Sequence, residues 1–313
     1  MSVKQSTIGG INMDIGVIGV GTMGRNHARI YSELKDVGNI YIYDVDRSKT
    51  KNIEKEYDAI FCDLDSLLHK ADAVSICVPT KDHFKIAKKC FEKGIHCLIE
   101  KPVALNSRSG EELLKFLREN LIVGVGHIER FNPIVKEIKK VVVNPKYVEI
   151  KRHNPASSRI NDASVVLDLM IHDIDLVWNY FFKDQSYVFH SFGDKSVFKV
   201  MAKFNNCIIS LSASKIANKK IRSIYVETEK FTVEGDFMNQ EIYIYKKPEK
   251  YSIENEKYRQ ENIIEKVLIN KVEPLKEELK TFINCVKNNK QFPVTLEEAI
   301  LNLKIAEKIE GKA

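Results

Sequence analysis

The segment from Asp14 to Arg29 constrains the fold more than any other part of the chain. It reads Asp-Ile-Gly-Val-Ile-Gly-Val-Gly-Thr-Met-Gly-Arg-Asn-His-Ala-Arg, so a β-rich apolar run leads into Gly19, Gly21 and Gly24 in a GxGxxG pattern. A strand, these glycines and then a helix are typical of a dinucleotide-binding site. The glycines permit a tight turn, a close approach of the backbone to a pyrophosphate, and close packing of helix on strand. A glycine turn without a ligand is the alternative.

The 313 residues are enough for two domains, and the patterns along the chain divide accordingly. From residue 13 to 122, apolar strand runs alternate with helical patterns, which predicts an α/β Rossmann domain with a doubly wound parallel sheet. From residue 123 to 313, helices and a series of period-2 segments predict an α+β domain for substrate binding and oligomerisation, with a large, mainly antiparallel sheet. Residues 1–12 show no periodicity, and we expect a flexible leader there.

The cofactor type is indicated by Asp44, which ends the next predicted strand 20 residues after Gly24. A carboxylate there can accept hydrogen bonds from the adenosine ribose and repels a 2′-phosphate, which favours NAD. NADP stays open because the guanidinium of Arg47 could receive that phosphate. Thr22 and Met23 lie inside the glycine loop, and we expect them beside the cofactor as well.

Three further motifs carry a family resemblance. They are Cys77-Val-Pro-Thr-Lys-Asp-His83, Ile99-Glu-Lys-Pro102 and Asp168-Leu-Met-Ile-His-Asp-Ile-Asp175. In this order after a Rossmann fingerprint, they closely resemble the glucose-fructose oxidoreductase and inositol dehydrogenase (Gfo/Idh/MocA) family. The resemblance covers nearly the whole chain from Met13 and implies a dehydrogenase that acts on CH–OH groups.

The resemblance assigns roles to the first two of these motifs. It implies that Lys101 is catalytic, that Glu100 lies near the nicotinamide ribose, and that Pro102 follows a cis peptide bond. It also implies that the loop with Pro79 and His83 runs along the cofactor, although such a loop could merely cap a helix. Read without the family, Glu100-Lys101 is an ion pair before a turn, but it follows a strand, and ligands bind at the carboxyl ends of parallel strands. Asn26 and His27, in the first helical turn after the glycines, are weaker candidates.

The third motif lies on a predicted helix, Ser164 to Phe182. Asp168 and His172 are four residues apart and therefore share one face of that helix. Histidine, with an ordinary pKa of about 6.5, can accept a hydroxyl proton during hydride transfer, while Lys101 can stabilise the developing alkoxide. We expect Asp168 to orient His172. A purely structural histidine is the alternative.

The substrate is indicated by the segment Gly126-His-Ile-Glu-Arg-Phe-Asn-Pro133. Together with a later basic loop, it most resembles the UDP-N-acetylglucosamine 3-dehydrogenases within the family, which implies a UDP-sugar as small-molecule substrate. Tentative substrate contacts are Arg130, Asn132, Arg152 and Arg159, since arginine suits a diphosphate. A solvated basic loop is the alternative reading. A dehydrogenase of a free polyol such as myo-inositol, or a non-catalytic NAD(H) sensor on the same fold, also remains open.

Composition limits the setting. The net charge of +6 is too mild to require nucleic acid. No apolar run is long enough to span a membrane, and the start lacks a secretory pattern. Six cysteines without close spacing predict neither a metal site nor a disulfide framework, so we expect a cytoplasmic protein. The broad predicted sheet leads us to expect a homodimer or homotetramer.

Overall fold

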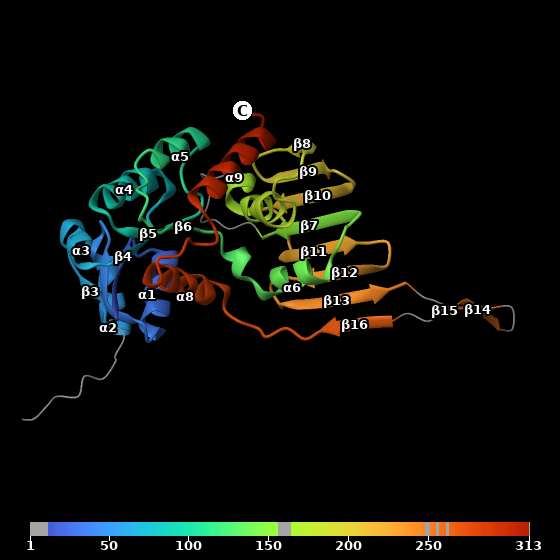
Figure 1. The fold of residues 1–313 in the computed structure, drawn as a ribbon, viewed down its shortest axis with the longest axis horizontal. Coiled ribbons are helices and arrows are strands. Elements are labelled where there is room, and N and C mark those ends of the chain that lie inside the picture. The colour runs from blue at the N-terminus through green and yellow to red at the C-terminus, as the bar shows by residue number, and fades with distance from the viewer. Residues whose placement is uncertain (1–11, 156–163, 248–250, 255–256, 261–262, 313) are drawn as a thin grey trace, which may run out of the picture. The chain divides into compact units, whose positions relative to one another are not determined.

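The computed structural model describes residues 12–155, 164–247, 251–254, 257–260 and 263–312 (Figure 1). Contacts divide the chain into two units, which are described separately below. The first comprises the chain up to Gly126 together with Leu275–Glu297, and the second comprises His127–Pro274 and Glu298–Ala313.

The first unit contains a six-stranded parallel sheet in the order β3-β2-β1-β4-β5-β6. Its strands are β1 Met13–Ile18, β2 Val37–Tyr43, β3 Ile60–Phe61, β4 Ala73–Ile76, β5 His96–Glu100 and β6 Val123–Gly126. Its helices are α1 Thr22–Glu33, α2 Thr50–Tyr57, α3 Leu64–Lys70, α4 Thr80–Lys93, α5 Ser107–Leu114 and α8 Pro274–Lys287, with a 3-10 turn at Arg47–Lys49. The strand order reverses between β1 and β4, which is the point where doubly wound sheets bind ligands.

The second unit contains an eight-stranded sheet in the order β16-β13-β12-β11-β7-β10-β9-β8, in which only the β7–β10 pair is parallel. Its strands are β7 Tyr147–His153, β8 Tyr187–Gly193, β9 Val197–Phe204, β10 Cys207–Ser214, β11 Ile221–Glu227, β12 Phe231–Asp236, β13 Glu241–Lys246 and β16 Ile263–Val267. Its helices are a 3-10 turn at Ile128–Phe131, α6 Pro133–Val141, π-helical turns at Val166–Met170 and Asp175–Phe181 around α7 Ile171–Ile174, and α9 Leu296–Ile309. We call the run of π and α turns the 166–181 helix. A separate hairpin is formed by β14 Tyr251–Glu254 and β15 Lys257–Gln260.

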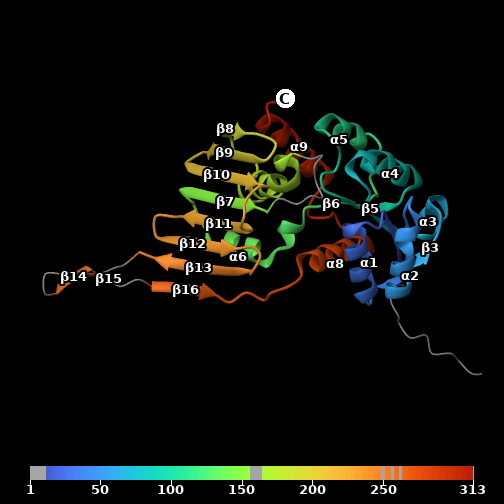
Figure 2. The same cartoon turned by 180° about the vertical axis from the view of Figure 1, so that it is seen from behind.

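The core of the second unit lies on one face of the large sheet. Alternate residues of each central strand, such as Val148 and Ile150 on β7, are buried with Ile134 and Ile138 of α6. Figures 1 and 2 show α6 and the 166–181 helix beside the large sheet. The period-2 burial follows because successive side chains of a strand point to opposite faces.

Both predicted sheets are confirmed, but the structure divides the chain differently from the sequence pattern. β6 belongs to the parallel sheet, so the first unit continues past residue 122 to Gly126. The later segment Leu275–Glu297 also belongs to this unit, where the Val125 amide donates to the Val294 carbonyl at 3.1 Å. These segments join the first unit through contacts with residues that are distant along the chain. The local periodicity of a sequence does not reveal such contacts.

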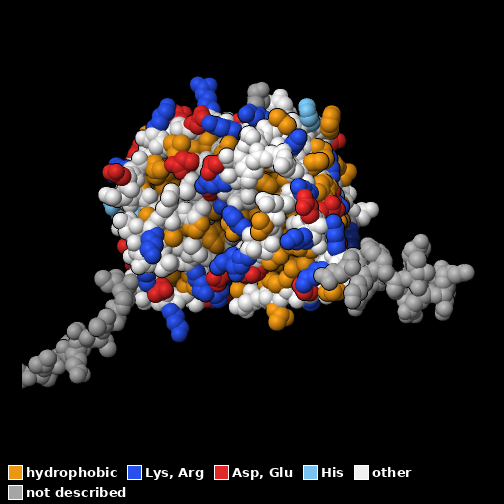
Figure 3. Space-filling model, turned by 45° about the vertical axis from the view of Figure 1, so that its right-hand side comes forward, with side chains coloured by type: hydrophobic (Ala, Val, Ile, Leu, Met, Phe, Trp, Pro, Cys, Tyr) orange, Lys and Arg blue, Asp and Glu red, His pale blue; other side chains and the backbone are white. Residues whose placement is uncertain are grey.

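The described residues lack two features, a membrane-spanning helix and a cluster of metal ligands. None of their helices is long and apolar enough to cross a membrane. Among the same residues, no group of three or more His, Cys, Asp or Glu side chains is arranged to hold a metal ion. On the face shown in Figure 3, acidic and basic side chains are interspersed rather than gathered into one basic band.

Candidate active site

The glycine loop connects β1 to α1 and has the geometry of a phosphate-binding turn. Gly19 has a φ of 87°, and a Cβ there would lie 2.8 Å from the backbone of Cys77 and Val78 in the β4–α4 loop. A Cβ on Gly24 would overlap the carbonyl oxygen of Gly19. A Cβ on Gly21 would meet no atom within 4 Å, and no side chain caps the helix that begins after it. An open approach to the amino end of α1 fits a diphosphate group.

Asp44 holds the same loop from the end of β2. Its carboxylate accepts hydrogen bonds from the amides of Val20 and Asp46, each at 2.9 Å. The side chain is only 9% exposed. Thr22 and Met23 form the first turn of α1, directly after the glycine at its amino end. Asp44 therefore fixes the position of the glycine loop, in addition to the ribose contact expected of it.

Arg47 is engaged within its own unit. Its guanidinium forms an ion pair with Glu54, including a 3.0 Å bond from Nη2, and donates to Thr50. The guanidinium carbon also lies 3.9 Å from the centre of the Phe61 ring. A 2′-phosphate would have to compete with Glu54 for this arginine.

The Glu100-Lys101-Pro102 segment follows directly from β5. Glu100 is buried, and one of its carboxylate oxygens lies 2.9 Å from Nε2 of His27 on α1. The other oxygen accepts from the Lys101 amide at 3.2 Å. Burial opposes ionisation of this carboxyl, but the hydrogen bond and charge of His27 and the charge of Lys101 outweigh it, so the pKa of Glu100 is lowered. The Lys101–Pro102 peptide bond is cis.

His83 holds the loop that contains Pro102. Its Nδ1 lies 2.9 Å from the Pro102 carbonyl oxygen, and its Nε2 lies 2.8 Å from that of Val78. Burial lowers the pKa of His83, despite these two carbonyls. Because both ring nitrogens face backbone carbonyls, His83 holds this loop in place, and a contact between the loop and the cofactor stays a prediction. Pro79 is exposed and precedes the first residue of α4.

In the second unit, the 166–181 helix carries Asp168 and His172. The helix is partly π-helical, as the bond from the Phe182 amide to the Val177 carbonyl at 3.0 Å shows. Such widened turns are frequent at functional sites. The His172 ring lies edge-on to the ring of His127, with centroids 6.1 Å apart and an angle of 82°.

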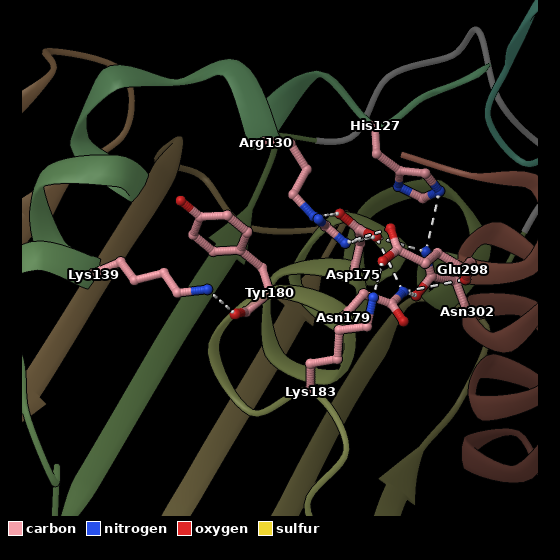
Figure 4. A network of polar contacts seen from close by, with 9 residues as sticks. All are labelled: His127, Arg130, Lys139, Asp175, Asn179, Tyr180, Lys183, Glu298 and Asn302. Atoms are coloured by element: carbon pink, nitrogen blue, oxygen red, sulfur yellow. Dashed lines mark hydrogen bonds and ion pairs between the residues drawn. The ribbon is translucent and has the colours of Figure 1, made fainter. Parts of the chain in front are cut away.

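A buried polar network extends from His127 (Figure 4). Asn302 on α9 lies 3.2 Å from Nε2 of His127 and donates to Asp175 at 3.0 Å. Burial opposes ionisation of Asp175, but the charges of His127 and Arg130 outweigh it, so the pKa of Asp175 is lowered. Through the ring contact of His127, this network supports the side of the helix on which His172 lies.

The network changes the role of Arg130. Its guanidinium donates to Asp175 at 2.6 and 3.0 Å and to Glu298 at 3.2 Å. Only 6% of the side chain is exposed. Arg130 is therefore a structural ion-pair partner of the helix, and the predicted diphosphate contact would require these ion pairs to break.

The guanidinium of Arg152, also predicted to contact the substrate, is likewise paired with buried acids. It is 1% exposed, binds Asp173 through Nε and Nη2 at 2.7 to 3.1 Å, and binds Glu129 at 2.7 Å. Asn132 is buried too, where it accepts from the Ile134 amide and donates to Glu129. Arg159 lies outside the described residues. Arg130 and Arg152 are thus both paired with acidic side chains, most of which are distant along the chain.

Sequence reasoning missed two features of the site. Asn302 lies far from any recognised motif, and no local pattern marked it. Arg222 is the second: it stands on β11 in register with Arg152. Its position beside the acids of the second unit arises only from strand pairing.

The chain resembles known proteins over both units. Residues 13–130 match the family model described as an oxidoreductase family with an NAD-binding Rossmann fold. UDP-N-acetylglucosamine 3-dehydrogenase of Acidithiobacillus ferrooxidans is 32% identical over 243 residues, which are 75% of this chain and 77% of the relative. The chain belongs to the Gfo/Idh/MocA oxidoreductase family.

Solved structures extend this Gfo/Idh/MocA assignment to nearly the full length. A structure of the Acidithiobacillus ferrooxidans enzyme superposes with a TM-score of 0.85 at 26% identity and covers 97% of this chain and 98% of that one. A myo-inositol 2-dehydrogenase of Thermotoga maritima is 26% identical over 178 residues, 52% of this chain and 53% of the relative. Family membership makes the chain a dehydrogenase, as its motifs implied.

Proposed function

We propose that this protein is an NAD-dependent dehydrogenase that oxidises the 3-hydroxyl of UDP-N-acetylglucosamine to a ketone. The observation that carries the reaction type is the placement of Lys101 at the carboxyl end of β5, where Glu100 holds its backbone. The glycine loop at the carboxyl end of β1 supplies the cofactor site in the same sheet. The substrate rests on the similarity to the Acidithiobacillus ferrooxidans enzyme.

The proposed mechanism assigns separate roles to His172, Lys101 and Asp168. His172 accepts the proton of the substrate hydroxyl, and Lys101 donates a hydrogen bond to the same oxygen as negative charge develops there. Asp168 orients these groups, and Gly21 and the first turn of α1 hold the diphosphate of the cofactor. NAD, when bound, accepts the hydride from the substrate carbon.

The choice of NAD is supported by the surroundings of the ribose position. Asp44 is held in place by two backbone amides, and its carboxylate would repel a 2′-phosphate. Arg47 is paired with Glu54 and cannot receive that phosphate without breaking the pair.

The proposal is tested by measuring NADH formation as a rise in absorbance at 340 nm. UDP-N-acetylglucosamine, myo-inositol and glucose 6-phosphate are added separately to the protein with NAD. We expect turnover with UDP-N-acetylglucosamine alone, and reduction of the product with borodeuteride should place deuterium at C3. Turnover only with myo-inositol would support the polyol alternative. Cofactor binding without turnover of any substrate would support a sensor.

The catalytic roles have a separate test. Lys101→Met and His172→Ala should each lower kcat by about 100-fold or more, since general acid–base groups contribute 10²- to 10⁴-fold. If both groups act on one oxygen, the double variant should lose less than the product of the single losses. Full turnover by either single variant would contradict its assignment.

We further propose a homodimer or homotetramer formed through the open face of the large sheet. By strand register, this face carries exposed apolar side chains at Val188, Phe192, Val197, Met201, Ile208 and Ile264. Most of these side chains lie on the neighbouring strands β8, β9 and β10, and exposed apolar side chains gathered on a sheet face are typical of a protein interface. The six cysteines are all free thiols, which supports the proposed cytoplasmic setting.

A further inference from the structure

Arg222 lies on the helix-covered face of the large sheet, beside another arginine and two buried acidic side chains. It pairs across β11 and β7 with Arg152, so both guanidinium groups reach the same buried layer. The acids in that layer are Glu129 and Asp173. If one arginine donates its hydrogen bonds to both acids, the other arginine keeps donors that can bind a ligand.

Arg152 takes nearly all of the acceptor capacity. Asp173 receives its Nε and Nη2, and one oxygen of Glu129 receives its Nη1 at 2.7 Å. The other oxygen of Glu129 accepts from Asn132 at 3.2 Å. Glu129 and Asp173 therefore provide enough acceptors for the guanidinium of Arg152, but not for a second one.

Arg222 is left with unused donors. Among the described residues, its Nη1 forms an ion pair at 3.7 Å with the Glu129 oxygen that Arg152 already occupies. Its Nε is buried and has no hydrogen-bond partner among the described residues. The side chain is nonetheless 31% exposed, so a ligand can reach it. A buried N–H without an acceptor destabilises the folded protein, and a bound anion would remove that cost.

Electrostatics favours an anion at this position. Burial and the charge of Arg152 lower the pKa of Arg222, against the opposing effect of Glu129, Asp173 and Asp168. A negatively charged ligand would offset the repulsion between the two arginines. Glu129, the ion-pair partner of Arg222, also binds Arg152, and Arg152 binds Asp173 on the 166–181 helix, so the Arg222 guanidinium lies near the candidate catalytic helix.

We propose that Arg222 binds the diphosphate of the nucleotide-sugar substrate. The planar guanidinium matches phosphate oxygens in a bidentate geometry. In a UDP-sugar the diphosphate is attached to C1, close along the ring to the C3 hydroxyl, so an anion site near Asp168 suits oxidation at C3. This inference rests on the proposed function, and it replaces Arg130 and Arg152 as the diphosphate contact.

Titration calorimetry with UDP on the full chain, saturated with NAD, tests the inference. Arg222→Met should weaken UDP binding by about 10- to 100-fold, since a hydrogen bond to a charged group contributes about 1.5–3 kcal/mol. Arg222→Lys keeps the charge without the planar fork and should be intermediate. Arg118→Met removes the same charge from an exposed position on the surface of the first unit and should leave binding unchanged.

The outcomes separate this inference from the proposed function. If the wild-type protein turns over UDP-N-acetylglucosamine and Arg222→Met binds UDP as tightly as wild type, the inference is overturned while the function stands. If no UDP-sugar is turned over, inorganic pyrophosphate serves as the probe on the NAD-saturated protein. Pyrophosphate binding that depends on Arg222 would then support the anion site without the proposed substrate, and binding that does not would overturn it. Should Arg222→Met fail to fold, Arg222→Lys decides.

Discussion

Two buried carboxylates, Glu100 in the first unit and Asp173 in the second, each have one main side-chain partner that favours the ionised form. Glu100 relies on His27, and Asp173 relies on Arg152. The pKa of Glu100 is lowered in the folded state, whereas burial raises the pKa of Asp173 even with its arginine present. Removing the neighbour leaves an uncompensated buried charge in each case, which is costly.

His27→Ala should destabilise the protein by about 1–3 kcal/mol near neutral pH. The lowered pKa of Glu100 means that its ionised form stabilises the fold above the unfolded pKa, and that this contribution is lost as pH falls through the folded pKa. The loss caused by His27→Ala should therefore shrink when unfolding is measured below about pH 4.5, the range where an ordinary glutamate takes up its proton. The same loss at both pH values would contradict the role of His27, and Glu100→Gln in the His27→Ala background should remove most of the pH dependence.

Arg152→Met should cost about 3–5 kcal/mol in chemical denaturation, because it strands Glu129 and Asp173 without their partner. Arg118→Met is the matched control. Its guanidinium lies on the surface of the first unit and donates only to a backbone carbonyl, that of Glu92. We expect Arg118→Met to lower the free energy of unfolding by less than about 0.5 kcal/mol. A stable Arg152→Met protein with impaired substrate binding would restore Arg152 as a substrate contact.

At the scale of elements, the turn between β1 and α1 contains one glycine that has no room for a side chain and another that borders open space. Gly24 is close-packed against Gly19, whereas Gly21 faces free space. One glycine is thus required by the fold and the other by whatever approaches the amino end of α1.

The two glycines should respond differently to alanine. Gly24→Ala should lower both the stability and the affinity for NAD, because its methyl group must displace backbone. Gly21→Ala should leave the melting temperature within about 2 °C, corresponding to less than about 0.5 kcal/mol, yet weaken NAD binding measured by fluorescence titration. Unchanged NAD affinity in Gly21→Ala would show that the open space is not where the cofactor lies.

The connection from β2 to α2 should set the cofactor preference. We expect NADP to bind at least about 10-fold more weakly than NAD, because Asp44 repels the extra phosphate and Glu54 holds Arg47. Asp44→Ser combined with Glu54→Ala should narrow that ratio by about 10-fold, whereas Glu56→Ala, on the same helix, should not. A wild-type preference for NADP would overturn the cofactor proposal.

At the scale of the whole molecule, the open face of the large sheet predicts association. Phe192→Asp together with Met201→Asp should convert the oligomer to a monomer in analytical ultracentrifugation, because both side chains are exposed on that face. Val143→Asp alters an equally exposed apolar residue that follows α6, and it should leave the oligomer intact. A wild-type monomer of 36.0 kDa at micromolar concentration would contradict the proposal.

The sequence by itself determined the features that depend on local order along the chain. The alternation of strands and helices predicts the parallel sheet, the period-2 segments predict the antiparallel one, and the GxGxxG pattern predicts the loop at the amino end of α1. The motifs around Lys101 and His172 identify the family. Each of these signals lies within one or two neighbouring elements, so periodicity and spacing can report it.

Only the tertiary structure decided which charged side chains are available to a ligand. No local pattern in the sequence distinguishes Arg130 and Arg152 from Arg222. In the structure, Arg130 is paired with Asp175 and Glu298, and Arg152 is paired with Glu129 and Asp173. Strand pairing and helix packing bring these partners together from positions up to 168 residues apart. Because a buried charge must find its partner wherever the fold places it, the number of arginines in a segment does not tell how many remain to bind a substrate.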